Sequence, residues 1–268
     1  MNLVKENLQQ AIPSLVVLLD VKSFPWDKIE RLLNKKFAER VAECKGESII
    51  VEACIYDVIV EARKQMPQAI RLLHFISKLF EDLAITLEAT EKPLIKRTIQ
   101  QMLESFDLKY LNFVGELAAL NALLKSGNYQ LVSLEDKMPN GKFVDFKLKQ
   151  VGQDKFLLVE VVNIHLDSSK VVDDAEAIRK RLMHKLSRKI EDKRTGLDNN
   201  VQFHLIPVVW GDWQDIKIYS EFFKAHKLEL PEVTEPVAYL NLHDSEGYCE
   251  HHFGRVSTLF ERNSSLAT

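Results

Sequence analysis

Residues 142–164 read KFVDFKLKQVGQDKFLLVEVVNI, and the fold expected for the second half of the chain follows from this stretch. Residues 156–164 are almost wholly apolar, which is typical of a strand covered on both faces. Residues 142–149 alternate between polar and apolar side chains, which predicts a second strand. A turn at Gly152 joins the two. Asp145 and Glu160 stand inside these strands, although acidic residues are poor strand formers.

The flanking sequence extends this pattern in both directions. Residues 129–135 predict a strand, and Asn140-Gly141 is a strong hairpin signal between it and the next strand. After residue 164 the pattern predicts a helix over 174–194, a strand over 201–210, a helix over 213–226, a strand over 237–242 and a short helix over 253–262. The apolar stripe of the first of these helices consists of Ile178, Leu182, Leu186 and Ile190.

In the first part of the chain the apolar residues recur at helical spacing. Helices are predicted over residues 26–44, 48–65, 67–87 and 90–106, followed by one more over 108–125. The helix over 26–44 carries Ile29, Leu32, Leu33, Phe37 and Val41 at helical spacing. We therefore expect an antiparallel helical bundle over residues 1–106 and an α/β domain over 107–268, with a mixed sheet flanked by helices.

Net charge, cysteine content and the lengths of the apolar segments limit the classes of protein to which the chain can belong. The net charge of −3 over 268 residues gives no global attraction for nucleic acid, so any basic footprint must be local. Three scattered cysteines fit reduced thiols, and Cys44 and Cys54 are expected to be small core residues. No segment is long and apolar enough to span a membrane, and no signal peptide is recognised. These features predict a cytoplasmic protein with no membrane association.

Three acidic residues occupy positions that are unfavourable for a carboxylate: one lies on or beside the apolar face of a helix, and two lie inside strands. Glu116 lies at helical spacing from Phe113 and Leu120, on or beside the apolar face of the 108–125 helix. Asp145 and Glu160 lie in the two strands. Taken alone, each acid is interpreted as a surface residue or as a partly buried residue with a hydrogen-bonding or ionic partner. Together, in consecutive elements, they predict a shared site whose hard oxygen ligands suit Mg²⁺ or Mn²⁺.

The order of these acids resembles the PD-(D/E)XK nuclease superfamily, which has a restriction-endonuclease-like fold. The resemblance covers roughly residues 107–225 and rests on Glu116, Val144-Asp145 and Val159-Glu160-Val161. It implies that Asp145 and Glu160 bind the metal, that Glu116 assists, and that the protein hydrolyses DNA or RNA phosphodiesters.

One position departs from the family pattern. The family's lysine should stand two residues after Glu160, where this chain has Val162. Either the ammonium comes from elsewhere, with Lys147, Lys185 and Lys189 as candidates, or the site is altered. We expect a metal-dependent nuclease in which Lys147 or Lys185 supplies the charge. The alternative is a degenerate nuclease fold that binds nucleic acid or a protein, with the helical region as the partner-binding element.

The helix over 174–194 is rich in basic residues. Such a face could contact phosphates beside the acids. The basic residues are Arg179, Lys180, Arg181, Lys185, Arg188, Lys189, Lys193 and Arg194. Glu191 and Asp192 support the other interpretation, a solvated helix face of mixed charge. The sequence leaves both open.

Overall fold

The structure is a computed structural model that describes residues 2–19, 24–43, 54–166, 175–198, 201–211, 213–226, 230, 233, 237–243 and 249–258. The chain divides into two compact units, Met1–Asn121 and Ala122–Thr268. The division falls inside helix α7 (Tyr110–Lys125), whereas the sequence pattern predicts the change of character before this helix, at residue 106.

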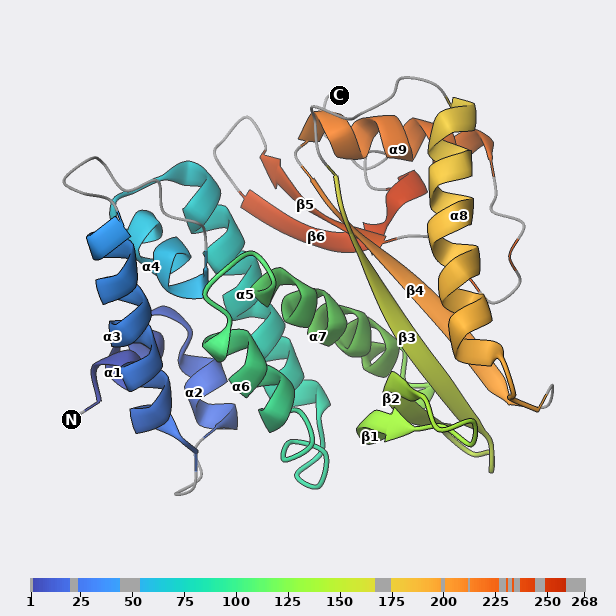
Figure 1. Ribbon diagram of the computed structural model, residues 1–268, viewed down its shortest axis with the longest axis horizontal. Coiled ribbons are helices and arrows are strands. Elements are labelled where there is room, and N and C mark those ends of the chain that lie inside the picture. The colour runs from blue at the N-terminus through green and yellow to red at the C-terminus, as the bar shows by residue number, and fades with distance from the viewer. Residues whose placement is uncertain are drawn as a thin grey trace. The chain divides into compact units, whose positions relative to one another are not determined.

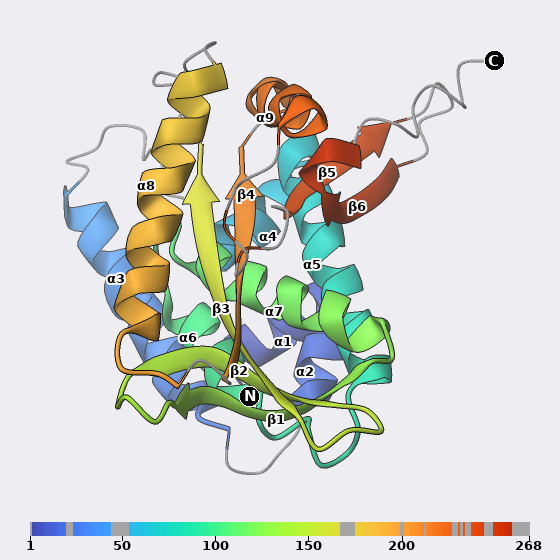
Figure 2. The same cartoon turned by 90° about the vertical axis from the view of Figure 1, so that its right-hand side faces the viewer.

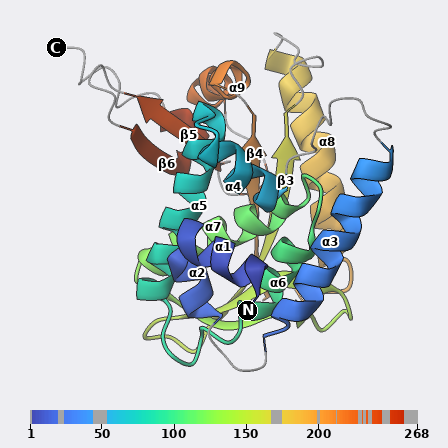
Figure 3. The ribbon, with the colours of Figure 1, turned by 90° about the vertical axis from the view of Figure 1, so that its left-hand side faces the viewer.

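The first unit is helical in its described residues, as predicted. Its helices are α1 (Leu3–Ala11), α2 (Pro13–Leu18), α3 (Trp26–Glu43), α4 (Ile55–Arg63), α5 (Pro67–Thr86), α6 (Lys96–Glu104) and most of α7. Helix α5 packs against α2 and α4, and α3 packs against α1 and α6 (Figure 3). The side chain of Asn2 caps α1 by accepting a hydrogen bond from the Lys5 N–H. Prolines at the starts of α2 and α5 suit the first helical turn.

The apolar stripe expected on α3 is only partly buried. Ile29 is fully buried, but Phe37 is 62% exposed and Val41 is also exposed. The burial of this stripe therefore does not extend to the last two turns of the helix. Helical spacing identifies the helix, but burial depends on which other elements reach it.

An ion pair ties three parts of the first unit together. The guanidinium of Arg40 on α3 contacts both carboxylate oxygens of Asp57, at 3.3 and 3.2 Å, and donates to the Phe106 carbonyl at 2.7 Å. Asp57 in turn accepts the N–H of Cys54, the residue before α4, at 2.9 Å. Cys54 is buried, as predicted, and this burial raises the pKa of its thiol to about 11. Cys44 lies outside the described residues.

The second unit is a mixed α/β structure built on a six-stranded sheet with the order β1-β2-β3-β4-β5-β6 (Figure 1). The strands are β1 (Tyr129–Lys137), β2 (Phe143–Gln150), β3 (Phe156–His165), β4 (Gln202–Trp210), β5 (Val237–His243) and β6 (Cys249–Arg255). Strands β1, β2 and β3 are antiparallel neighbours, β3, β4 and β5 are parallel, and β6 is antiparallel to β5. Strand β3 is buried along most of its length, as its apolar sequence predicts.

Helices connect the parallel strands and cover one sheet face. Helix α8 (Ala175–Arg194) links β3 to β4, and α9 (Trp213–Ala225) links β4 to β5 (Figure 2). The predicted stripe of α8 is confirmed: Ile178, Leu182 and Leu186 are buried and Ile190 is partly buried. These side chains share one apolar cluster with residues of α9 and with Leu158, Val162 and Ile164 of β3. Both helices therefore pack on the same face of the sheet.

The end of the chain differs from the sequence expectation. Residues 249–255 form strand β6, which the sequence pattern does not predict, and the expected helix over 253–262 is reduced to a 3₁₀ turn (Val256–Thr258). Pairing of β6 with β5 decides the conformation of residues 253–255, since seven consecutive residue pairs align between the two strands. The rest of that expected helix lies outside the described residues.

None of the helices, as far as the described residues extend, is long and apolar enough to cross a bilayer.

Candidate active site

Strands β2 and β3 separate at the position of Asp145. Their pairing runs from Lys149 opposite Phe156 to Phe146 opposite Val159 and ends there. At the next step the Asp145 carboxylate accepts the N–H of Val161 at 2.6 Å. The side chain thus takes the place of a backbone acceptor at the point of separation. This role explains why an aspartate is tolerated inside a strand.

Glu160 lies on the same face of the sheet as Asp145. Lys147 stands opposite Leu158, and two residues further along the two strands come Asp145 and Glu160, which therefore point to the same side. This is the face that α8 covers, because Leu158 belongs to the core cluster shared with that helix. Glu160 is 3% exposed, so its charge requires a partner.

Two lysines of α8 supply that partner. Lys189 Nζ lies 2.7 Å from Glu160 Oε1, and Lys193 Nζ lies 3.0 Å from Oε2. The two lysines are four residues apart and so share one helix face. The contact of Lys193 lacks the alignment of a hydrogen bond, and Oε2 has no aligned donor within the described part of the chain. Glu160 Oε2 is therefore in an ion pair with the Lys193 ammonium but accepts no hydrogen bond from the described residues.

The shifts in pKa follow from this arrangement. Burial and the neighbouring charge of Glu160 raise the pKa of Asp145 to about 7, against the opposing effects of the Val161 N–H and the two lysines. Burial lowers the pKa of Lys189. The hydrogen bond and charge of Glu160 and the charge of Asp145 outweigh this effect, so the pKa is raised overall. The two carboxylates repel each other, and the ammonium groups of Lys189 and Lys193 offset part of this repulsion.

The hairpin between β1 and β2 holds the end of α8 in place. Asn140 donates from its side-chain amide to the carbonyls of Lys193 at 2.8 Å and Thr195 at 2.9 Å. These carbonyls belong to the end of a helix, where the backbone acceptors have no intrahelical partner. Lys142 pairs with Asp192 at 2.7 Å, and Lys193 Nζ also donates to the Phe143 carbonyl. The predicted Asn140-Gly141 turn thus has a second role, which is to position the helical turn that carries the two lysines.

The lysines expected from the sequence lie at other places. Lys147 Nζ is 3.6 Å from Asp136 Oδ2 and 5.0 Å from the centroid of the Phe156 ring. Lys185 Nζ donates to the Asn163 carbonyl at 3.0 Å. Lys189, the third candidate, is at Glu160, together with Lys193, which sequence reasoning did not single out. The four-residue spacing of lysines 185, 189 and 193 beside the apolar stripe is the signal that could have found it.

The position of Val162 explains why the ammonium comes from the helix. Val162 is buried in the cluster that includes Leu182 and Leu186 of α8. A lysine at this position would place its charge beneath the helix. The covering helix supplies the lysines instead, from the turn that lies over Glu160.

Glu116 belongs to the first unit. It lies on α7 and is partly buried, between the buried Gly115 and Leu117. The site of the second unit accordingly consists of Asp145, Glu160, Lys189 and Lys193.

The residues present fit a hard divalent cation in their donor chemistry. Asp145 and Glu160 offer neighbouring carboxylates, and the pKa of Asp145 is raised first by burial and then by the charge of Glu160, both of which a bound cation would offset. Within the described residues no group of three or more His, Cys, Asp or Glu side chains is arranged to hold a metal. A cation held by Asp145 and Glu160 would take the place of at least one lysine contact to Glu160.

A scan against protein-family models, a search of curated proteins and a search of solved structures each returned no significant match.

Proposed function

We propose that the second unit is a metal-dependent nuclease of restriction-endonuclease-like fold that hydrolyses DNA or RNA phosphodiesters. The observation that carries this proposal is the grouping of Asp145 and Glu160 at the separation of β2 and β3, with Lys189 Nζ 2.7 Å from Glu160. The order of three antiparallel strands, a helix and a parallel strand supports the fold assignment. Such folds host several activities, so the site rather than the fold supports the function.

Asp145 and Glu160 would hold Mg²⁺ or Mn²⁺. When bound, such a metal lowers the pKa of a coordinated water and stabilises charge on the phosphate oxygens. The carboxylates supply two hard oxygen donors, and their burial restricts competing water. In the reaction, a water oxygen attacks phosphorus and gives up a proton to solvent, the bond to the leaving oxygen breaks, and that oxygen takes up a proton from solvent.

Lys189 is the residue that we assign to the reacting phosphate. Its side chain is 38% exposed, whereas that of Lys193 is 14% exposed and is also bound to the Phe143 carbonyl. Lys189 can therefore turn toward a substrate when a metal binds Glu160, while Lys193 stays in place as a positioning residue. An ammonium beside the phosphate stabilises the negative charge that develops during attack.

A basic face on α8 supports a nucleic-acid substrate. A shallow hollow of 570 Å³ is lined by basic groups, namely Lys180, Arg181, His184, Lys185 and Arg188. Burial lowers the pKa of Lys185, and the charges of Arg181 and Lys189 lower it further, so like charges are crowded here. Of the three acids on α8, Asp192 pairs with Lys142 and Glu176 with Arg179. Phosphates would relieve this crowding.

The test is cleavage of labelled single- and double-stranded DNA and RNA by the full chain with Mg²⁺ or Mn²⁺. We expect Asp145→Asn and Glu160→Gln to abolish cleavage and Lys189→Met to reduce its rate by about 100-fold. Lys224→Met is the matched control, because this lysine is exposed on α9 and pairs only with Glu221 among the described residues. It should cleave like the wild type.

Cleavage that survives Asp145→Asn combined with Glu160→Gln would exclude this site as its source. Equal losses in Lys189→Met and Lys224→Met would instead remove the role assigned to Lys189.

One observation favours a second candidate, a nucleic-acid-binding module without catalysis. Two lysines contact Glu160, so the charge of this buried carboxylate is compensated without a metal. Such a cluster can serve the fold alone, with the basic face of α8 retaining affinity for phosphates. Salt-dependent binding of DNA or RNA, without cleavage and without a thermal shift on addition of Mg²⁺ or Mn²⁺, would favour this candidate.

A further inference from the structure

A pocket of 710 Å³ lies beside the candidate active site, within the second unit. Lys147 and Leu158 line it, and these residues stand opposite each other on β2 and β3. Asp145 and Glu160 follow two residues further along the same strands and on the same face. Two strand residues span about 7 Å, so the pocket and the acids are neighbours.

The walls of the pocket suit a planar aromatic group. Leu158, Met138 and Pro139 provide apolar surface, and the residue Phe156, which also lines the pocket, is 42% exposed. Apolar walls with a few polar groups are typical of pockets for small ligands, and 710 Å³ lies within their usual size. An exposed aromatic ring in such a wall can stack on a nucleobase.

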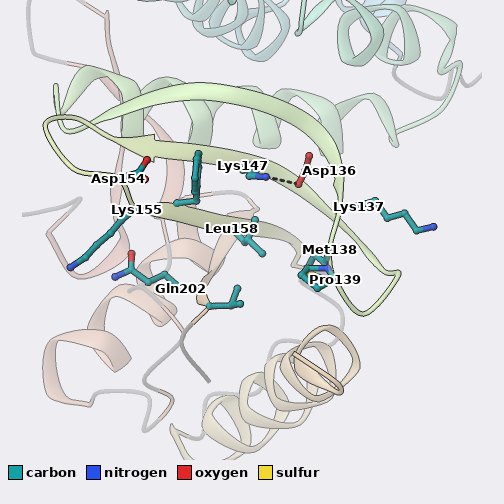
Figure 4. Close-up of a pocket in the computed structure, with 11 residues that line it drawn as sticks. Asp136, Lys137, Met138, Pro139, Lys147, Asp154, Lys155, Leu158 and Gln202 are labelled. Atoms are coloured by element: carbon teal, nitrogen blue, oxygen red, sulfur yellow. Dashed lines mark ion pairs between the residues drawn. The ribbon is translucent and has the colours of Figure 1, made fainter. Parts of the chain in front are cut away.

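Two of the polar lining residues, Lys147 and Asp136, form a donor and acceptor pair; the other polar lining residues are Lys137, Asp154, Lys155 and Gln202. Lys147 Nζ and Asp136 Oδ2 lie 3.6 Å apart, and Figure 4 shows the two side chains pointing toward each other at the pocket wall. Ser133 donates to the other oxygen of Asp136 at 2.7 Å, which holds the carboxylate in place. Lys147 is also held over the Phe156 ring. The wall therefore presents an ammonium donor next to a carboxylate acceptor.

We propose that this pocket binds the guanine base of a nucleotide adjacent to the cleaved phosphodiester, and this inference rests on the proposed nuclease function. Of the four common bases, guanine alone places two adjacent N–H donors beside a carbonyl oxygen. The carboxylate of Asp136 accepts from the N–H groups, and Lys147 donates to the carbonyl. Phe156 provides the stacking surface.

The contacts proposed for guanine also require that the base is unpaired. The two N–H groups and the carbonyl lie on the edge that pairs with cytosine in a duplex. That edge is available only when the base is unpaired, as in a single strand, a loop or an extruded nucleotide. The pocket therefore predicts a preference for guanine in unpaired substrate.

The experiment measures binding without cleavage. Wild-type full chain in EDTA is titrated into labelled single-stranded 12-mers of thymidine or uridine that carry one central guanine, inosine or adenine. We expect the guanine oligonucleotide to bind about tenfold more tightly than the adenine one. Inosine, which lacks the exocyclic amino donor, should fall between them.

Variants connect the preference to the pocket. Asp136→Asn should remove most of the preference for guanine, and Phe156→Ala should weaken binding of the guanine oligonucleotide about tenfold through lost stacking. Lys147→Met should also reduce the preference. Lys224→Met is the control, because Lys224 is exposed on α9, pairs with Glu221, and neither residue lines the pocket. Circular dichroism checks that each variant is folded.

The outcomes separate this inference from the proposed function. A guanine preference that Asp136→Asn removes supports the pocket even if no cleavage is found with metal. Equal binding of guanine and adenine oligonucleotides in both DNA and RNA, or a preference that survives both Asp136→Asn and Phe156→Ala, would overturn it even if the protein cleaves nucleic acid.

Discussion

Replacing both lysines at Glu160 by methionine should destabilise the second unit by more than the sum of the single replacements. Glu160 is 3% exposed, and each of its oxygens faces one ammonium, at 2.7 Å from Lys189 and 3.0 Å from Lys193. Either lysine alone still leaves the buried charge with a partner. Removing both leaves it with none among the groups that the structure describes around it.

The expected magnitudes follow from burial. Breaking a buried ion pair by removing one partner costs about 3–5 kcal/mol, because a charge is left uncompensated. In Lys193→Met, Lys189 still compensates Glu160, so we expect a loss of about 2 kcal/mol. Lys189 is 38% exposed, and solvent already screens its charge, so Lys189→Met should cost at most about 1 kcal/mol. The double variant should lose about 4 kcal/mol.

The assay is urea unfolding followed by circular dichroism at pH 7 in EDTA. Glu160→Gln is the diagnostic third substitution. In the wild type it should be destabilising, because Lys189 and Lys193 lose their carboxylate partner. In the double variant it should be stabilising, because it removes the unpaired buried charge. Additive effects of the two lysine substitutions, together with no rescue by Glu160→Gln, would refute the view that the lysines compensate one buried carboxylate.

Further predictions concern metal binding, the hairpin and the first unit. Mn²⁺ at 100 times its dissociation constant should stabilise the wild type by about 2.7 kcal/mol, measured by thermal unfolding, and should not stabilise Asp145→Asn. Asn140→Ala should cost about 1 kcal/mol in urea unfolding, because two carbonyls at the end of α8 lose their donor; no loss would show that the turn does not hold the helix. Tyr110→Phe should be neutral or stabilising, since the buried Tyr110 hydroxyl has no hydrogen-bond partner among the described residues. Tyr56→Phe should cost about 1 kcal/mol, since this hydroxyl donates to the Leu103 carbonyl at 2.9 Å, and equal effects of the two tyrosine variants would contradict this reasoning.

Local pattern in the sequence predicted most elements of the second unit. Alternation and apolar runs identified β1 to β4, and Asn140-Gly141 identified the hairpin, because these signals depend only on neighbouring residues. Where pairing with a distant segment decides the conformation, local pattern failed: residues 253–255 form part of β6 through contact with β5. The exposure of Phe37 on α3 has a similar cause, because a stripe records which face is apolar but not what covers it.

The candidate site divides in the same way. The sequence alone identified Asp145 and Glu160 as candidate site residues, because each is an acidic residue inside a predicted strand, and strand patterns depend only on neighbouring residues. Which ammonium faces them was decided by tertiary structure alone. Successive residues of a helix point about 100° apart, so the lysine that reaches Glu160 depends on how α8 is rotated and shifted over β3. Contacts of Asn140 and Lys142 with the last turn of α8, about 50 residues away in the chain, set that placement and bring Lys189 and Lys193 to the buried carboxylate.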